Sequence, residues 1–295
     1  MASQLATTTT THITHRRLWL LWAILALAFV YTLMPEGTNP AIMLILGEMQ
    51  VIFALVHWST WAGWRTALLG FVIVFGVSYL SEFIGTHTGL VFGDYYYSDT
   101  LLGPLIGKVP PLVMLAYFAM GYTSYVLARI IAGGGINGLY ERITGWRLVL
   151  VAAMTALIMT FNDLALDPIS STVKGDWTWV DGGAYFGVPI HNFYGWFGTI
   201  FVFTILVGLL LLRKTPAQMI ARPVPKQFAY QAVVMYAIFM AATLVKPLLG
   251  NTGEIYTAMF MIASLIMLLP ILATIAALTR NTDADSRQGL EKIGT

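Results

Sequence analysis

The sequence predicts an all-α fold, a polytopic transmembrane helical bundle of about eight spans, and three observations support it. The chain has 295 residues, of which 58% are hydrophobic and only 10% are charged, and its mean hydropathy is +0.75. Soluble domains are typically about 25% charged. A chain this apolar has too little polar surface to coat itself in water. The other two observations are a series of long apolar runs and an uneven distribution of basic residues.

The apolar runs follow one another with short gaps. Each has about 17–24 residues, enough to cross a hydrocarbon core of about 30 Å at about 1.5 Å per residue. A transmembrane barrel would instead show alternating segments of about ten residues. The predicted spans are 18–34, 41–57, 66–85, 110–132, 146–166, 189–212, 227–249 and 255–278.

The first of these runs has some features of a signal peptide, because Arg16 and Arg17 precede it. The run is long and lacks a clear cleavage site between small residues, so we interpret it as a retained span. The predicted organisation is therefore a disordered tail over 1–15, a single transmembrane domain over 16–279 and a polar tail over 280–295.

The basic residues set the predicted orientation. Of the 16 Lys and Arg residues, all but Lys108, Lys174 and Lys246 fall on the side of the two termini when the chain is given eight spans. Lys and Arg accumulate in cytoplasmic loops, so both termini are predicted to be cytoplasmic and the protein to be a multi-pass protein of the plasma membrane. The formal net charge of +2 and the scattered basic residues argue against nucleic-acid binding.

Four carboxylates lie in or beside the predicted spans, where ionisable groups are costly and usually functional. Asp163 and Asp167 are four residues apart and so share a helix face. They and Glu82 are predicted to lie near the non-cytoplasmic boundary, whereas Glu48 lies near the middle of the second span. The acids at the boundary are therefore the first candidates for a site.

Other polar and aromatic residues are expected at the same depth. His191 and Asn192 open the sixth span, Lys108 precedes the fourth, and Lys246 ends the seventh. The long loops 86–109 and 167–188 are rich in aromatic residues, which form either an interfacial belt or the wall of an apolar cavity. The candidates for holding substrate or water are Asn162, Asn192, Tyr97, Trp179, Tyr185 and Trp196.

Some candidates also have a purely structural interpretation. Asp167 can order the loop after Pro168, which is expected to close the fifth helix, and Lys246 can extend toward the interface. Glu82 and Asp163 are harder to explain by structure alone. The other candidates with a structural alternative are Glu48 and His191, and the histidines expected to be peripheral are His12, His15 and His57.

The residue types limit the chemistry. The chain has no cysteine, which excludes disulfides, iron–sulfur clusters and thiolate-bound haem or zinc. It has no histidine cluster, so a metal oxygenase and a metal site are not expected. Acid–base chemistry by buried carboxylates remains, because burial favours the protonated form of a carboxyl group. A protonated acid can protonate an alkene while a carboxylate or His activates water, which is an alkene hydratase without a cofactor.

Two stretches resemble the signature blocks of a known family. They are "TGLVFGDYYYSDTLLGPLIGKVP" over 88–110 and "NDLALDPISSTVKGDWTWVDGGAYFGVPIHNFYGWF" over 162–197. Their combination of FG-x-Y-x-Y, LGP, DP, W-x-W and YFGVP-x-x-N-F-x-GW is similar to the carotenoid biosynthesis family of membrane carotenoid 1′,2′-hydratases. The segment "KVPPLVMLAY" has fewer Trp residues than the family leads us to expect, which leaves the choice of carotenoid open.

The resemblance implies water addition to a linear ψ-end of a carotenoid, of the γ-carotene or bacterioruberin type. Protonation at C2′ gives a tertiary cation at C1′, which water captures. It also implies a membrane-dissolved carotenoid as substrate and makes other enzymes of the carotenoid pathway candidate partners. From burial and chemistry, we assign Asp163 or Glu82 as proton donor and Asp167 or His191 as the group that activates water.

Two other functions are weighed against the hydratase. A proton-coupled transporter of a small apolar or amphipathic solute could use Glu48, Glu82 and Asp163 as a relay, and it predicts polar residues through the full membrane depth. A retinal-type photoreceptor would need Lys246 as its Schiff-base lysine. Lys246 lies at a helix end before Pro247 rather than in the middle of a span, which disfavours the photoreceptor.

Overall fold

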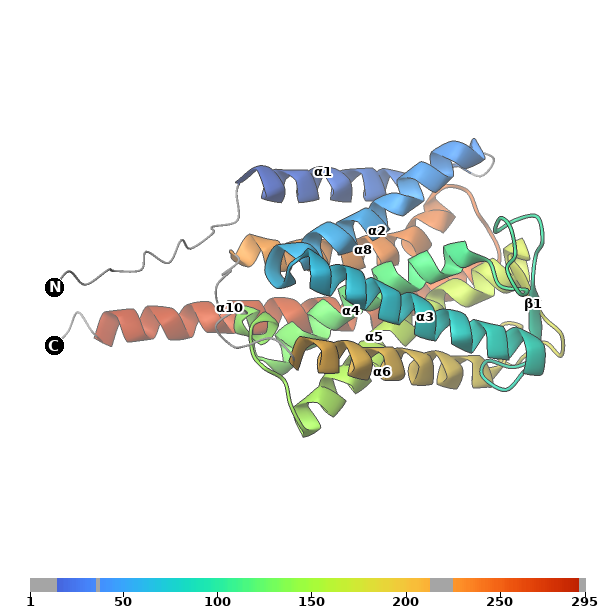
Figure 1. Ribbon diagram of the computed structural model, residues 1–295. Coiled ribbons are helices and arrows are strands. Elements are labelled where there is room, and N and C mark those ends of the chain that lie inside the picture. Colours follow the sequence, from blue (N-terminus) through green and yellow to red (C-terminus); the bar gives the residue numbers. More distant parts are fainter. Residues whose placement is uncertain (1–14, 36–37, 213–224, 292–295) are drawn as a thin grey trace.

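The computed structural model describes residues 15–35, 38–212 and 225–291, with the backbone alone for Pro40 and for 281–291. Its helices run side by side in one bundle (Figure 1). They are α1 (His15–Thr32), α2 (Pro40–Ala62), α3 (Trp64–Thr88), α4 (Pro111–Ala132), η1 (Ile136–Leu139), α5 (Trp146–Asp167), η2 (Pro168–Lys174), α6 (Ile190–Leu212), α8 (Lys226–Leu248), α9 (Glu254–Ile262), η3 (Ala263–Met267) and α10 (Leu268–Glu291).

Seven helices of the described part are long and apolar enough to cross a membrane, with α9, η3 and the first part of α10 forming one of them. Each coincides with a predicted span, so the polytopic helical bundle is confirmed. The other predicted span lies in α1, which begins with His15, Arg16 and Arg17 and packs against α2 and α8. The predicted N-terminal tail over 1–15 lies outside the described residues except for His15. Helix α10 continues into the predicted C-terminal polar tail as far as Glu291.

The start of α1 and the end of α10 lie at the same end of the bundle in Figure 1. The long connections with the short strand β1 lie at the opposite end. Helix α4 occupies the centre, in contact with α2, α3, α5, α8 and α10. Its side chains are buried almost continuously from Tyr117 to Ile130, as expected for a helix enclosed by others.

A two-stranded antiparallel ribbon joins the two long loops. Strand β1 (Tyr95–Tyr97) pairs with β2 (Trp177–Trp179). Because side chains alternate along a strand, one face of the ribbon carries Tyr95, Tyr97, Trp177 and Trp179, while Tyr96 and Thr178 on the other face are exposed. The sequence predicts only helices and loops here, so the ribbon is a feature that was not predicted.

The α-helix α5 ends at Asp167, just before Pro168, as the sequence predicts, but the chain does not leave the helical path at Pro168. The chain continues through it as the π-helical turn η2, which ends at Gly175 with φ of 72°. Proline lacks a backbone N–H and clashes with the preceding turn, and a wider π-type turn accommodates it. The turn places Asp167 immediately before a buried segment that includes Ser170 and Ser171.

One close approach docks the loops on the bundle. A Cβ atom at Gly195 in α6 would lie 2.1 Å from the carbonyl oxygen of Val91. Only glycine permits this contact between the helix and the loop that precedes β1. The ribbon is therefore held directly against the ends of the spans.

A buried polar network lies away from this ribbon, and it corrects the expectation that His57 is peripheral. His57 is fully buried, with Nδ1 2.6 Å from the Tyr122 hydroxyl and Nε2 2.9 Å from the Phe228 carbonyl oxygen. Arg129 is also buried and donates through Nε to the Gly138 carbonyl oxygen at 2.9 Å. Both groups are satisfied within the protein and connect α2, α4, α8 and the turn after α4.

Candidate functional site

Glu82 is held by three phenols at the loop end of the bundle. It is 3% exposed and lies in the last turns of α3. The hydroxyls of Tyr95 and Tyr97 donate to Oε2, the second at 2.8 Å, and that of Tyr117 donates to Oε1 at 2.8 Å. Both carboxyl oxygens therefore act as acceptors, which suits an ionised carboxylate.

The phenols in the ribbon are kept as donors by their surroundings. Burial, followed by the charge of Glu82, raises the pKa of Tyr97 well above its ordinary value. The same two causes raise the pKa of Tyr95. Both hydroxyls therefore stay protonated across the pH range of ordinary biochemistry, and each can donate to Glu82.

Asp163 and Asp167 form a second buried centre, bridged by one amide. Each is 1% exposed. The Nδ2 atom of Asn192 donates to Oδ2 of Asp163 at 2.9 Å and to Oδ2 of Asp167 at 2.7 Å. Their spacing of four residues on α5 places both carboxyls on the side that faces α6. The first turn of α6 thus supplies the group that holds the two acids together.

The two acids differ in their other contacts. Oδ1 of Asp167 accepts from the indole N–H groups of Trp177 at 2.9 Å and Trp179 at 3.3 Å. Oδ1 of Asp163 is buried and has no hydrogen-bond partner in the described part of the chain. Indole and amide groups can only donate here, so Asp167 is set as an acceptor. Asp163 keeps one oxygen free to carry a proton.

Aromatic contacts join the two centres. Tyr95 packs against Trp179 with ring centroids 4.9 Å apart, and Tyr97 against Trp177 at 6.1 Å. Tyr117 stacks on Trp196 at 4.4 Å with an interplanar angle of 10°. The inner face of the ribbon therefore carries two phenols that bind Glu82 and two indoles that bind Asp167.

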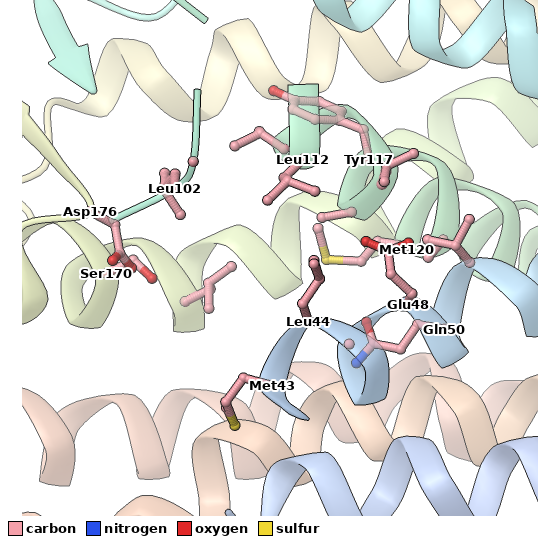
Figure 2. A pocket seen from close by; sticks show the side chains of 18 of the residues that line it. Met43, Leu44, Glu48, Gln50, Leu102, Leu112, Tyr117, Met120, Ser170 and Asp176 are labelled. Carbon is pink, nitrogen blue, oxygen red and sulfur yellow. The ribbon is translucent and has the colours of Figure 1, made fainter. Parts of the chain in front are cut away.

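A cavity of about 630 Å³ reaches these aromatic residues from the side of α2 and α4 (Figure 2). Tyr117, Trp177 and Trp196 belong to its wall. Tyr117 donates to Glu82, Trp177 donates to Asp167, and Trp196 stacks on the ring of Tyr117. The acids lie one layer behind this wall. On α4 the lining extends from Leu112 to Met120, roughly 12 Å at 1.5 Å per residue.

The cavity has polar groups at both ends of a mainly apolar wall. Figure 2 shows Ser170 and Asp176 at one end and Glu48 and Gln50 at the other. Burial is the largest cause that raises the pKa of Asp176 above its ordinary value, opposed by nearby Lys174 and a hydrogen bond with Ser170. This end lies next to the ribbon, because Trp177 follows Asp176 directly.

The structure brings most of the predicted site residues together. Glu82, Asp163, Asp167, Asn192, Tyr97 and Trp179 share the hydrogen bonds described above. Trp196 stacks over the Glu82 centre. Tyr185 donates to the Leu164 carbonyl oxygen at 2.9 Å, and burial followed by the charges of Asp163 and Asp167 raises its pKa to about 12. Asn162 is buried, and its Nδ2 has no partner within the described ranges.

Other candidates lie apart from the acids. His191 is exposed, because the helix start of α6 turns Asn192 inward and its neighbour outward. Lys108 is exposed in a tight turn with φ of 67°, and Lys246 lies in the last turn of α8. Across the described ranges, no group of three or more His, Asp or Glu side chains is placed to hold a metal ion.

Tyr95, Tyr117 and Trp177 are site residues that were not predicted from the sequence. A usable signal exists for two of them, because Y-Y-Y and W-T-W alternate like short strands. If paired, these strands would place alternate rings on one face. Tyr117 gives no such signal, since it is one aromatic residue among many on an apolar helix.

The two loops that form the ribbon, together with the spans that carry the acids, also lie in the part of the chain that decides the family. The model of the family described as "Carotenoid biosynthesis protein" matches residues 39–267. The chain belongs to this carotenoid biosynthesis family. The match includes both loops of the ribbon and all the acids of the site, and it confirms the resemblance seen in the sequence.

One curated relative of the chain is named as a hydratase. The bisanhydrobacterioruberin hydratase of Haloarcula japonica is 29% identical over 185 residues, which cover 60% of this chain and 57% of the relative. The chain thus spans little more than half the length of this relative. No solved structure matches the chain.

Proposed function

We propose that this carotenoid biosynthesis protein is a hydratase that adds water across the terminal C1′–C2′ double bond of a linear carotenoid ψ-end. The observation that carries the proposal is the buried pair of Asp163 and Asp167, bridged by Asn192 behind the aromatic end of an apolar cavity. The family and the printed name of the Haloarcula japonica relative support the same reaction class.

Asp163 is the proton donor in this proposal. Its unpartnered Oδ1 carries a proton, and the alkene π electrons take that proton to form the new C–H bond at C2′. Asp163 is left as a carboxylate, and the positive charge resides on the tertiary carbon C1′. General acid catalysis of this kind contributes about 10²–10⁴-fold to a rate.

The cation is stabilised by the aromatic wall and by the acids behind it. The stacked rings of Tyr117 and Trp196 present π faces, which attract a cation by about 2 kcal/mol or more in a desolvated site. Glu82, held as an acceptor by three phenols, adds negative charge close to the same wall. The arrangement favours a transition state with positive charge over the neutral alkene.

Asp167 receives the proton that water loses. The water oxygen forms the C–O bond at C1′ while one of its protons moves to Oδ2 of Asp167, which has a lone pair beyond the one used by Asn192. The product is a tertiary alcohol. Transfer of the proton from Asp167 to Asp163 restores the starting state, so the cycle consumes only water and involves no oxidation or reduction.

The cavity offers separate routes of entry for water and for a carotenoid. The end with Ser170 and Asp176 is polar and lies beside the loops, which suits water. The apolar walls of α2 and α4 suit a carotenoid that enters from the bilayer with its end toward Tyr117. Because the acids lie behind Trp177, Tyr117 and Trp196, a shift of this wall admits the reacting end.

Expression in a lycopene- or γ-carotene-producing host tests the activity. We expect new, more polar pigments with the mass of added water, identified by chromatography and mass spectrometry against a host with empty vector. The membrane fraction is probed for the protein in parallel. Unchanged pigments with the protein present in the membrane would count against a carotenoid hydratase.

Proton-coupled transport remains the second candidate, because polar residues extend beyond the loop end to His57 and Arg129. A transporter would move protons with its solute, so pH-dependent flux into proteoliposomes distinguishes it from a hydratase. Both groups are hydrogen-bonded to backbone carbonyls, which fits a structural network better than a relay.

A further inference from the structure

Two polar side chains of α2 line the inner end of the cavity. Glu48, Gln50 and Met120 all line the cavity, and Figure 2 shows them on the side away from Asp176. The two polar residues lie within a membrane span, and most of the wall around them is apolar, with Leu44, Gly47 and Val51 as neighbours on α2. Neither residue belongs to the acid centres described above.

The protein does not satisfy these groups itself. Within the described part of the chain, no hydrogen bond or ion pair engages the Glu48 carboxyl or the Gln50 amide. A polar group in an apolar setting is costly unless something bonds to it. A ligand in the cavity is therefore the natural partner.

The surroundings define the chemistry of that partner. The walls are mainly apolar and aromatic, as for a hydrocarbon chain, and the polar groups include the Glu48 carboxyl and the Gln50 amide, which together offer both donors and acceptors. A neutral hydroxyl can donate to Glu48 and accept from Gln50. Met120 is three residues after Tyr117 on α4, a rise of about 5 Å along the helix, so the same cavity wall connects this end to the aromatic wall.

We propose that Glu48 and Gln50 form a hydroxyl-binding site for an isoprenoid alcohol within the cavity. This proposal rests on the proposed function, which identifies the molecule that enters the cavity as an isoprenoid. The hydroxyl has two sources, an alcohol already on the entering chain or the tertiary alcohol that hydration creates. In either case Glu48 determines which isoprenoids are retained.

Binding without turnover tests the site. Full-length protein in lipid nanodiscs is titrated with lycopene and with lycopene hydrated at both ends, and quenching of tryptophan fluorescence gives each Kd. We expect wild type to bind the hydrated chain about 10-fold or more tightly, the value of a hydrogen bond to a charged group. Glu48→Leu should lose this preference, and Glu48→Gln, which still accepts a hydrogen bond, should keep part of it.

A second pair of probes separates the two sources. Linalool carries a tertiary hydroxyl a few carbons from an unreacted terminal alkene, and myrcene is its hydrocarbon counterpart. A Glu48-dependent preference for linalool assigns the site to the entering chain, and a preference confined to hydrated lycopene assigns it to the product. Equal Kd values within both pairs in wild type, or a preference that survives in Glu48→Leu, would overturn the site.

The matched control is Glu254→Gln, which changes an exposed glutamate at the start of α9 and should leave every Kd unchanged. The outcome is also separable from the proposed function. A Glu48-dependent preference in a protein that hydrates no carotenoid would overturn the hydratase and leave the site. Hydration of a carotenoid by a protein without any Glu48-dependent binding preference would overturn the hydroxyl-binding site and leave the hydratase.

Discussion

Asp163→Asn is expected to abolish hydration, lowering the rate by about 10²–10⁴-fold. The amide keeps the shape of the side chain and can still accept from Asn192, but it cannot deliver a proton to the alkene. The measurement is the initial rate of hydroxycarotenoid formation by purified protein in lipid. Because the substitution is nearly isosteric, the protein should still insert, and its thermal unfolding should stay close to that of wild type.

The matched control is again Glu254→Gln, a carboxyl-to-amide change at an exposed position. It should leave the hydration rate unchanged. If folded Asp163→Asn kept more than about a tenth of the wild-type rate, an acid–base role would be excluded, since such roles exceed that factor. Glu82 would then become the candidate donor.

Glu82→Leu is expected to destabilise the loop end of the protein more than any other single change at the site. Leucine leaves the hydroxyls of Tyr95, Tyr97 and Tyr117 buried without an acceptor. Each unsatisfied group costs about 1–3 kcal/mol. The unfolding temperature in detergent should therefore fall sharply, and the ribbon should become accessible to protease.

Glu82→Gln provides the comparison within the same position. Its amide oxygen still accepts from the phenols, so its unfolding temperature should lie between those of wild type and Glu82→Leu. Glu254→Leu removes an exposed carboxyl and should unfold like wild type. A Glu82→Leu protein with wild-type stability would show that the phenols do not depend on this carboxylate.

The spans could be predicted from sequence because they depend on a property that is local and strong. A run such as 66–85 must be apolar over its full length to lie in lipid, whatever it packs against. The candidate acids could be predicted for the same reason, since Glu82, Asp163 and Asp167 stand out where charge is costly.

The contacts around these acids could not be predicted in the same way. Whether His191 or Asn192 faces inward depends on the rotation of α6 about its axis, which packing against α5 decides and hydropathy does not. Tyr117 binds Glu82 only because α3 and α4 pack side by side. The ribbon depends on pairing between residues about eighty positions apart, beyond the reach of local pattern.

The bridging role of Asn192 is the clearest example of this limit. The sequence places a polar residue at the start of a span, where a helix-start role would explain it equally well. Its contact with two carboxylates arises from the close packing of α5 and α6. The choice between Asp163 and Glu82 as proton donor likewise follows from which oxygen lacks a partner.

The source of the new oxygen atom tests the central claim most directly. Purified protein is incubated with lycopene in water enriched in heavy oxygen, under argon and in parallel under air. Acid-catalysed hydration predicts that the hydroxyl of the product carries the heavy isotope from water under both atmospheres. A product formed only under air, with its oxygen taken from O₂, would contradict a hydratase mechanism.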